Sequence, residues 1–349
     1  SPTVIAQEVG NAGIITLDRQ KALNAINLDM VKQIYPALKR FEQTKDLVII
    51  KGAGEKAFCA GGDVHAISFG DFELAKQFFH QEYTINASIQ ALRKPYVALI
   101  DGITMGGGVG LSVHGRYRVA TERTLFAMPE TAIGLFPDVG GGFFLPRLRG
   151  KLGMFLGLTG VRLKGRDVEK SGVATHFCES AKIPELEAEL CKCSSDQEVA
   201  ATLGKFCSKD STPFVLEQYM EQINECFSGA TVEEILERLK RDNSEWAKGI
   251  LKTLAKMSPT SMKVSKKQID LGANLTLPEC LVMEYRLAVR HAKDSDLKEG
   301  VRALLVDRDN QPKWNPPTLE EVTDQRVDSF FAPLEEDLKL PSDVLQAKL

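Results

Sequence analysis

The N-terminal half of the chain alternates between short apolar runs and stretches with helical spacing. Residues 46–51 and 95–101 are almost continuous apolar runs that end at a glycine bend, which is typical of buried parallel strands. Residues 3–18 contain two alternating segments joined by a glycine-containing turn and predict a hairpin. In 28–44 and 71–93, apolar positions recur at steps of three and four, which predicts two long helices. Strands that alternate with helices predict an α/β core with parallel pairing.

Shorter elements complete this half of the chain. Asn27 is placed to cap the helix at 28–44, because its side chain can accept a hydrogen bond from a free N–H group of the first turn. We expect a glycine-opened helix at 107–114 and short strands at 116–120 and 124–128.

After about residue 180 the strand-like runs disappear and helical spacing takes over. Residues 191–213 are rich in small and polar residues and predict a connection or insertion. We therefore divide the chain into a core at 1–180 and a mainly helical C-terminal region at 181–349 that packs on it. The helices predicted in that region are 231–242, 245–257, 261–271 and 279–292.

Two glycine-rich bends are the clearest candidates for chemistry. They are Phe58-Cys59-Ala60-Gly61-Gly62-Asp63 and the three glycines 106–108, and each follows an apolar run. Such bends can expose bare backbone N–H groups to one anionic oxygen, as in an oxyanion hole. Glycine at a strand end can also serve only to permit a turn. Three glycines that open a helix need a further reason, because glycine is unfavourable in helices.

Three carboxylates stand among apolar residues. Glu82 interrupts the apolar face of the helix at 71–93. There it is a buried functional acid, one half of a structural salt bridge, or a residue at the solvent-exposed margin of that face. Glu130 and Asp138 lie eight residues apart in an apolar loop punctuated by proline and glycine. Asp138 can alternatively cap the helix that follows it. If the three acids converge, burial and repulsion should raise the pKa of at least one and suit it to acid–base chemistry.

Composition narrows the range of partners. The 349 residues are 43% apolar and 26% charged, with a net charge of -3. Proteins that bind nucleic acids or anionic membranes favour a strongly basic face, so the charge balance gives no reason to expect either partner. No run of eighteen apolar residues predicts a membrane span. The seven cysteines lack CxxC spacing and the five histidines are scattered, so we expect free thiols in a reducing compartment and no metal site.

Several further motifs accompany the two glycine bends along the chain. They are Lys21-Ala22-Leu23-Asn24-Ala25, Met128-Pro129-Glu130-Thr131-Ala132-Ile133-Gly134 and Gly165-Arg166-Asp167-Val168-Glu169-Lys170-Ser171-Gly172-Val173. In this order and spacing, the bends and these motifs resemble the crotonase (enoyl-CoA hydratase/isomerase) superfamily. The resemblance implies a spiral of ββα units with an acyl-CoA thioester lying across it, and CoA as part of the substrate with no separate cofactor.

The resemblance also implies roles for individual residues. The N–H groups of Gly62 and Gly107 would bind the thioester oxygen as catalytic groups, and Gly107 would also contact substrate. Glu130 would contact the substrate and act as general base or as nucleophile. Asp138 would be a further catalytic and substrate-binding acid, and Glu82 a substrate-binding one, together orienting water and a substrate hydroxyl.

One departure from the hydratase pattern selects the expected reaction. Hydratases of this superfamily place a first catalytic glutamate where this chain has Gly110, so hydration is disfavoured. The resemblance then implies hydrolysis of the 3-hydroxyisobutyryl-CoA thioester in valine catabolism, with related 3-hydroxyacyl-CoAs as further candidate substrates. The alternatives are an enoyl-CoA double-bond isomerase and a catalytically inactive acyl-CoA-binding module.

The cellular setting is an expectation from the resemblance alone. Residues 1–5 show neither a signal peptide nor an Arg-rich transit peptide and begin without Met, so we expect a processed chain that has lost its targeting segment. The resemblance implies the mitochondrial matrix, with a homo-oligomer as one expected form.

Overall fold

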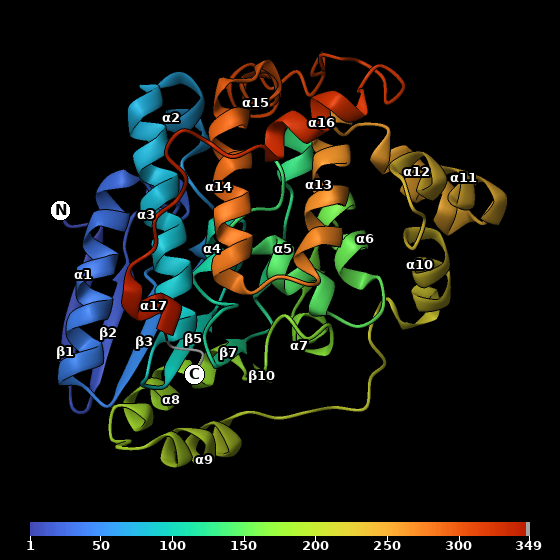
Figure 1. Ribbon diagram of the computed structural model, residues 1–349. Coiled ribbons are helices and arrows are strands. Elements are labelled where there is room, and N and C mark those ends of the chain that lie inside the picture. The colour runs from blue at the N-terminus through green and yellow to red at the C-terminus, as the bar shows by residue number, and fades with distance from the viewer. Residues whose placement is uncertain (347–349) are drawn as a thin grey trace.

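Two sheets and a shell of helices make up the computed structural model, which describes residues 1–346 (Figure 1). The larger sheet has the strand order β1-β2-β3-β5-β7-β10, and the smaller has the order β4-β6-β8-β9. The larger consists of β1 (Val4–Val9), β2 (Ala12–Leu17), β3 (Leu47–Gly52), β5 (Tyr96–Ile100), β7 (Tyr117–Ala120) and β10 (His176–Phe177). The smaller consists of β4 (Ala57–Cys59), β6 (Ile103–Met105), β8 (Leu125–Ala127) and β9 (Leu163–Lys164).

Strand pairing gives the architecture a repeating unit. β1 and β2 form the predicted antiparallel hairpin, and the remaining strands of the larger sheet pair in parallel. After β3, β5 and β7 the chain enters the smaller sheet as β4, β6 and β8, which are parallel, and then turns into helical segments. β9 runs antiparallel to β8. This succession confirms the predicted α/β spiral of ββα units.

Helices cover the spiral as predicted, with one boundary changed. Asn27 accepts a hydrogen bond from the Met30 N–H group and caps α1, as expected. α4 ends at Gly110, four residues before the predicted boundary, and residues 111–114 form turns. The helices of this half are α1 (Leu28–Thr44), α2 (Val64–Phe69), α3 (Phe72–Ala91), α4 (Gly107–Gly110), α5 (Gly141–Phe144), α6 (Leu152–Thr159) and α7 (Arg166–Lys170).

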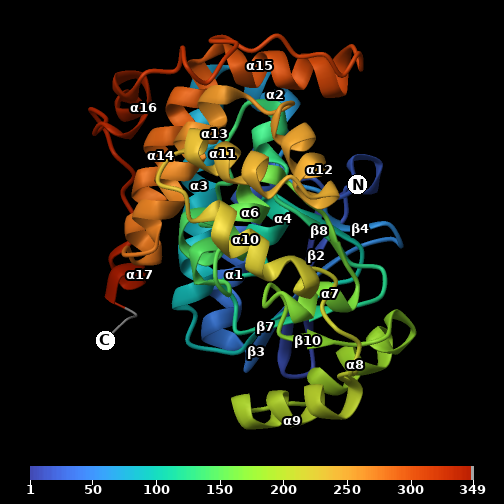
Figure 2. The same cartoon turned by 90° about the vertical axis from the view of Figure 1, so that its right-hand side faces the viewer.

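Beyond β10, the regular elements of the described residues are all helices joined by loops. The four predicted helices are confirmed as α11 to α14, and α10, α11 and α12 lie next to one another, in front of α6 in Figure 2. This part consists of α8 (Ile183–Leu190), α9 (Asp196–Phe206), α10 (Met220–Phe227), α11 (Val232–Asp242), α12 (Glu245–Leu254), α13 (Pro259–Gly272), α14 (Leu277–Lys293), α15 (Ser295–Val301), a π-helix (Arg302–Val306), α16 (Asp324–Phe331) and α17 (Ser342–Gln346).

The segment 191–213 is more ordered than predicted. It contains α9, whose first turn is capped by the Ser195 hydroxyl and whose Val199 and Leu203 are buried. Together with α8, this helix packs against one face of the larger sheet, in a core cluster with strand residues such as Ile49. The polar composition hid the helix because only two apolar positions in it need burial.

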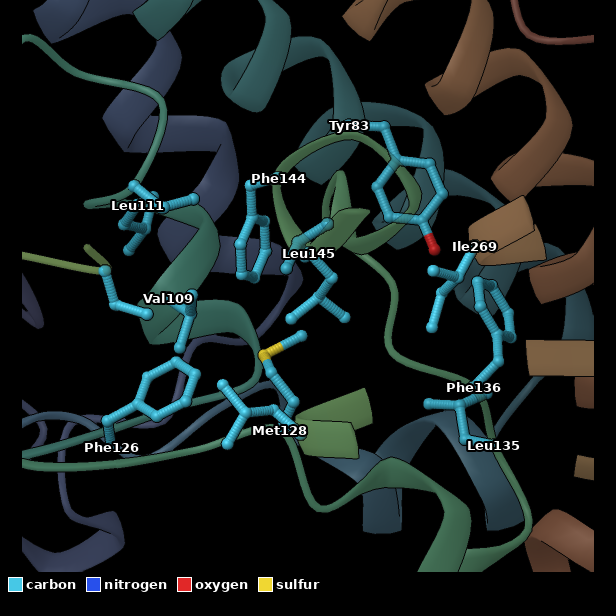
Figure 3. Close-up of a cluster of buried hydrophobic side chains, with 14 of the residues drawn as sticks. Tyr83, Val109, Leu111, Phe126, Met128, Leu135, Phe136, Phe144, Leu145 and Ile269 are labelled. Atoms are coloured by element: carbon cyan, nitrogen blue, oxygen red, sulfur yellow. The ribbon is translucent and has the colours of Figure 1, made fainter. Parts of the chain in front are cut away.

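One continuous core joins the strands to the C-terminal helices. The main cluster includes residues from both sides of position 180, and Figure 3 shows Ile269 of α13 within the same cluster as Val109 and Met128. The division at residue 180 stays a prediction. Within residues 1–346, no helix combines the length and apolar character that crossing a bilayer requires.

Candidate active site

A cavity of about 320 Å³ is lined by all five residues that the sequence predicted for the site. The glycine bends form part of its wall, α3 forms another part, and the loop after β8 closes it. Aliphatic and aromatic side chains make up most of the remaining surface, which favours a partly apolar acyl group. The five residues are Gly62, Glu82, Gly107, Glu130 and Asp138.

The two glycine bends lie next to one another, with their amides facing one shared space. A Cβ atom built on Gly107 would lie 3.3 Å from the Gly62 nitrogen, so the two amides border one small space. Gly61 (φ +129°) and Gly106 (φ +49°) precede them in conformations that favour glycine and turn the following N–H groups. Neither the Gly62 nor the Gly107 N–H group has a hydrogen-bond acceptor among residues 1–346. The arrangement can therefore bind one anionic oxygen.

Glu82 is a buried acid without a counter-ion. Its side chain, on α3, is 3% exposed, and no cation lies within salt-bridge distance in the described part of the chain. The salt-bridge alternative is therefore wrong. The Glu82 Oε2 atom is 2.9 Å from the position of a Cβ on Gly107, beside the amide pair. Burial, followed by the charges of Asp138 and Glu130, raises the pKa of Glu82 well above its usual value.

Glu130 begins the short 3₁₀ helix Glu130–Ile133 and is 6% exposed. Its Oε2 atom is 2.7 Å from the position of a Cβ on Gly106, and its Oε1 atom is buried with no hydrogen-bond partner among the described residues. Burial, and then the charge of Asp138, raises the pKa of Glu130 well above its usual value. An unpaired carboxyl oxygen beside the bends is free to accept a proton or to attack a carbonyl carbon.

Asp138 accepts a 2.7 Å hydrogen bond from the buried Tyr83 hydroxyl. Burial raises the pKa of Asp138 to about 6, and this hydrogen bond opposes the rise. The capping alternative for Asp138 is wrong, because its side chain makes no hydrogen bond to the start of α5. Instead, Glu284 of α14 accepts from the N–H groups of Gly140 and Gly142 there.

Three features of the site were absent from the sequence-based prediction. Tyr83 follows Glu82 and carried no separate signal. Glu284 did carry one, because it interrupts an apolar stripe of α14 with the same helical spacing as Glu82. The cavity is also bordered by Arg162 and by Leu304 of the π-helix, whose positions only the folded chain reveals. The interrupted stripe consists of Leu277, Leu281, Glu284, Ala288 and His291.

Comparison with known proteins identifies the family. The sequence profile described as "Enoyl-CoA hydratase/isomerase" matches residues 12–331. The chain belongs to the enoyl-CoA hydratase/isomerase family. This confirms the predicted resemblance, and the match includes the helical C-terminal part of this family member.

Curated relatives narrow the likeness within the family. This member is 57% identical to "3-hydroxyisobutyryl-CoA hydrolase, mitochondrial" of Xenopus laevis, over 95% of the chain and 90% of the relative. It is 53% identical to the protein of the same description from Homo sapiens, over 96% of the chain and 90% of the relative.

Solved structures of family members share the fold. A crystal structure described as a carnitinyl-CoA dehydratase from Mycobacterium thermoresistibile has a TM-score of 0.91 and 37% identity, with 97% of this chain and 99% of that chain covered. One described as an enoyl-CoA hydratase from Rhodobacter sphaeroides has a TM-score of 0.87 and 36% identity, with 97% and 100% covered.

Proposed function

We infer that this protein hydrolyses the thioester of 3-hydroxyisobutyryl-CoA to the free hydroxy acid and CoA. One observation carries the inference. Two bare amide N–H groups and three buried carboxyl groups surround one cavity, in a chain 53% to 57% identical to hydrolases of that description. Water and the acyl-CoA are the reactants, so the atoms balance without a cofactor.

The amides of Gly62 and Gly107 stabilise the oxyanion. As a nucleophile adds to the thioester carbon, negative charge moves to the carbonyl oxygen between the two N–H donors. Gly107 is the first residue of α4, so its N–H group lies at the N-terminal end of that helix, where no carbonyl within the helix can accept from it. The positions of both N–H groups are fixed before substrate arrives, so little reorganisation is needed in the transition state.

Glu130 has two chemically complete routes to hydrolysis. As a general base, it takes a proton from water while the water oxygen bonds to the carbonyl carbon, and the carbon–sulfur bond then breaks. As a nucleophile, its carboxylate bonds to that carbon and expels the CoA thiolate, and water then opens the resulting anhydride. The thiol leaves readily in both, since thiols have pKa values of about 8.5.

A single-turnover reaction in heavy-oxygen water separates the two routes. An anhydride opened by attack at the acyl carbon places the label in the product, whereas attack at the Glu130 carbon places it in the enzyme. Direct attack by water never labels Glu130. We therefore propose mass spectrometry of the Glu130 peptide after one turnover, in which incorporated label would exclude the general-base route.

Asp138 and Glu82 orient the attacking water and the 3-hydroxyl group of the substrate. Asp138 is held by Tyr83, and Glu82 lies beside the oxyanion site. Repulsion among the buried acids favours a shared proton, so one carboxyl can donate to the hydroxyl while another accepts from it. A site that hydrogen-bonds this hydroxyl should discriminate against acyl-CoAs that lack it.

The packing at Gly110 argues against hydratase chemistry. A Cβ at that position would lie 2.5 Å from the Val139 Cβ and 2.9 Å from the Asn86 Nδ2, so a glutamate does not fit. An isomerase needs Glu130 alone and leaves the other acids without a role. Release of free thiol from 3-hydroxyisobutyryl-CoA tests the proposal. A spectral change of an enoyl-CoA without thiol release would favour the isomerase. Binding of an acyl-CoA without any turnover would favour the inactive binding module.

The acidic limb of the rate profile should lie above the pH at which an ordinary glutamate ionises. Glu130 must be ionised in either route, and burial and Asp138 raise its pKa. Activity is therefore lost as pH falls through the raised pKa and is gained as pH rises through it. We expect kcat/KM to increase by about tenfold per pH unit on this limb, measured by thiol release. A flat profile down to about pH 5 would contradict an essential buried acid.

Arg162 is expected to help bind the CoA part of the substrate. It is exposed and is the cation among the described residues that line the cavity. Arg162→Gln should raise KM by about threefold to tenfold with kcat within about twofold, because an exposed ionic contact contributes modestly to binding. Arg241→Gln, at an exposed position of α11 away from the cavity, is the matched control. An unchanged KM for the Arg162 variant would remove this contact from the binding site.

The proposed setting follows the relatives. The relatives from Xenopus laevis and Homo sapiens both carry "mitochondrial" in their descriptions, and we place this protein in the mitochondrion. The matrix and a role in valine catabolism remain implications of the resemblance, and a homo-oligomer remains a prediction.

A further inference from the structure

The loop that carries Asp138 is held by buried side chains from outside the predicted site. Gln268 of α13 donates a 2.7 Å hydrogen bond from Nε2 to the Pro137 carbonyl. Glu284 of α14 accepts from Gly140 N–H at 2.8 Å and from Gly142 N–H at 2.9 Å. Hydrogen bonds from the C-terminal helices therefore fix the backbone on both sides of Asp138.

A third contact comes from the core of the spiral. The His114 Nε2 atom lies 2.7 Å from the Val139 carbonyl oxygen, within hydrogen-bonding distance. Val139 has φ +52°, an uncommon conformation for a β-branched residue, which persists where surrounding contacts impose it. The residue after Asp138 is thus held in a conformation that the isolated loop would seldom adopt.

The two C-terminal anchors are costly groups to bury. Glu284 and Gln268 are both 0% exposed, and Glu284 has no cation within salt-bridge distance in the described chain. Burial raises the pKa of Glu284 to about 8, and its two N–H donors oppose the rise. An apolar pair would fill the same volume without this desolvation cost, so maximal stability does not account for the choice.

We propose that Glu284 and Gln268 are positioning residues that hold the Asp138 loop in its reactive geometry and thereby set selectivity for the substrate 3-hydroxyl. The proposal rests on the proposed function and deepens it. It gives the C-terminal helices a part in the reaction, although neither side chain lines the cavity. Tyr83 holds the Asp138 carboxyl group itself, whereas Glu284 and Gln268 hold the backbone that carries it.

A graded series of substitutions tests the proposal in the full chain. Glu284→Gln keeps one carbonyl acceptor for the two N–H groups, and Glu284→Leu keeps none. Gln268→Leu removes the other anchor and keeps the test available if a Glu284 variant fails to fold. Ser265→Ala is the matched control, because Ser265 is buried on α13 and its hydroxyl has no partner among the described residues.

We expect kcat for 3-hydroxyisobutyryl-CoA to fall by about tenfold in Glu284→Gln and about a hundredfold in Glu284→Leu, with KM within about threefold. The kcat/KM ratio of this substrate to isobutyryl-CoA should fall by at least about tenfold. Amide hydrogen exchange of residues 137–142 should accelerate in the same order. Ser265→Ala should change none of these.

The outcomes separate the two levels of inference. If the parent releases no thiol from 3-hydroxyisobutyryl-CoA, the proposed function fails, and the exchange measurement still decides whether the anchors hold the loop. If the parent is active but folded variants keep its selectivity and its exchange rates, the positioning role is overturned. A loss of kcat with unchanged selectivity, in proportion to a lowered melting temperature, would likewise reduce Glu284 to a structural residue.

Discussion

Replacing Glu130 with glutamine is expected to lower kcat for thioester hydrolysis by about a thousandfold or more. Glutamine preserves the shape but can neither take a proton from water nor attack the carbonyl carbon, and positioned proton transfer typically contributes about a hundred- to ten-thousandfold. The buried Glu130 Oε1 atom has no hydrogen-bond partner in the described structure. Thiol release under substrate saturation measures the effect.

Stability supplies the control for this substitution. The pKa of Glu130 is raised on folding, so its ionisation opposes folding, and the resulting loss of stability grows as pH rises through the folded-state pKa. Glu130→Gln should therefore melt at the same temperature as the parent or higher at pH 8. Glu225→Gln, at an exposed position of α10, should keep full activity. Turnover by Glu130→Gln within a few-fold of the parent would remove this acid from the mechanism.

Adding one methyl group at Gly107 is expected to cost about a hundred- to a thousandfold in kcat. The new Cβ would lie 3.3 Å from the Gly62 nitrogen and 2.9 Å from the Glu82 Oε2, in the space that the thioester oxygen needs. Loss of one oxyanion donor has an effect of this size in other acyl-transfer enzymes. Gly107 does not have a left-handed φ, so the loss would come from the occupied space and not from backbone strain.

Gly249→Ala is the matched control for this change. Gly249 lies in α12, and a Cβ there meets no atom within 4 Å, so alanine should be tolerated with unchanged kinetics. Both variants should be compared by circular dichroism and by kcat. A Gly107→Ala enzyme with parental kcat would show that the thioester oxygen binds elsewhere.

Much of the fold follows from local patterns. The strand runs and the long helical stripes predicted β3, β5, α1 and α3 because burial imposes a period of two or 3.6 on any element with one apolar face. The short strands β4 and β6 escaped prediction, since three residues next to glycine bends carry too little periodicity. α9 was missed for a related reason, because its buried positions are few.

The site was predictable only as far as polar residues interrupt apolar patterns. Glu82 stood out in this way and proved to be buried without a counter-ion. Glu284 interrupts its stripe equally, yet a stripe does not tell which element the side chain meets. The alternative of a helix cap at Asp138 was wrong because the acceptor at that position comes from a helix more than 140 residues further along the chain.

The sequence by itself determined the main strands and the long helices, the family resemblance, and the two bends and three acids that mark the chemistry. These are local properties, encoded in periodicity, in glycine and in short motifs. The tertiary structure alone decided that the bends face one another, that Tyr83 holds Asp138, and that the C-terminal helices anchor its loop. Such contacts join residues far apart in the chain, and their geometry depends on how whole elements pack, which no local pattern specifies.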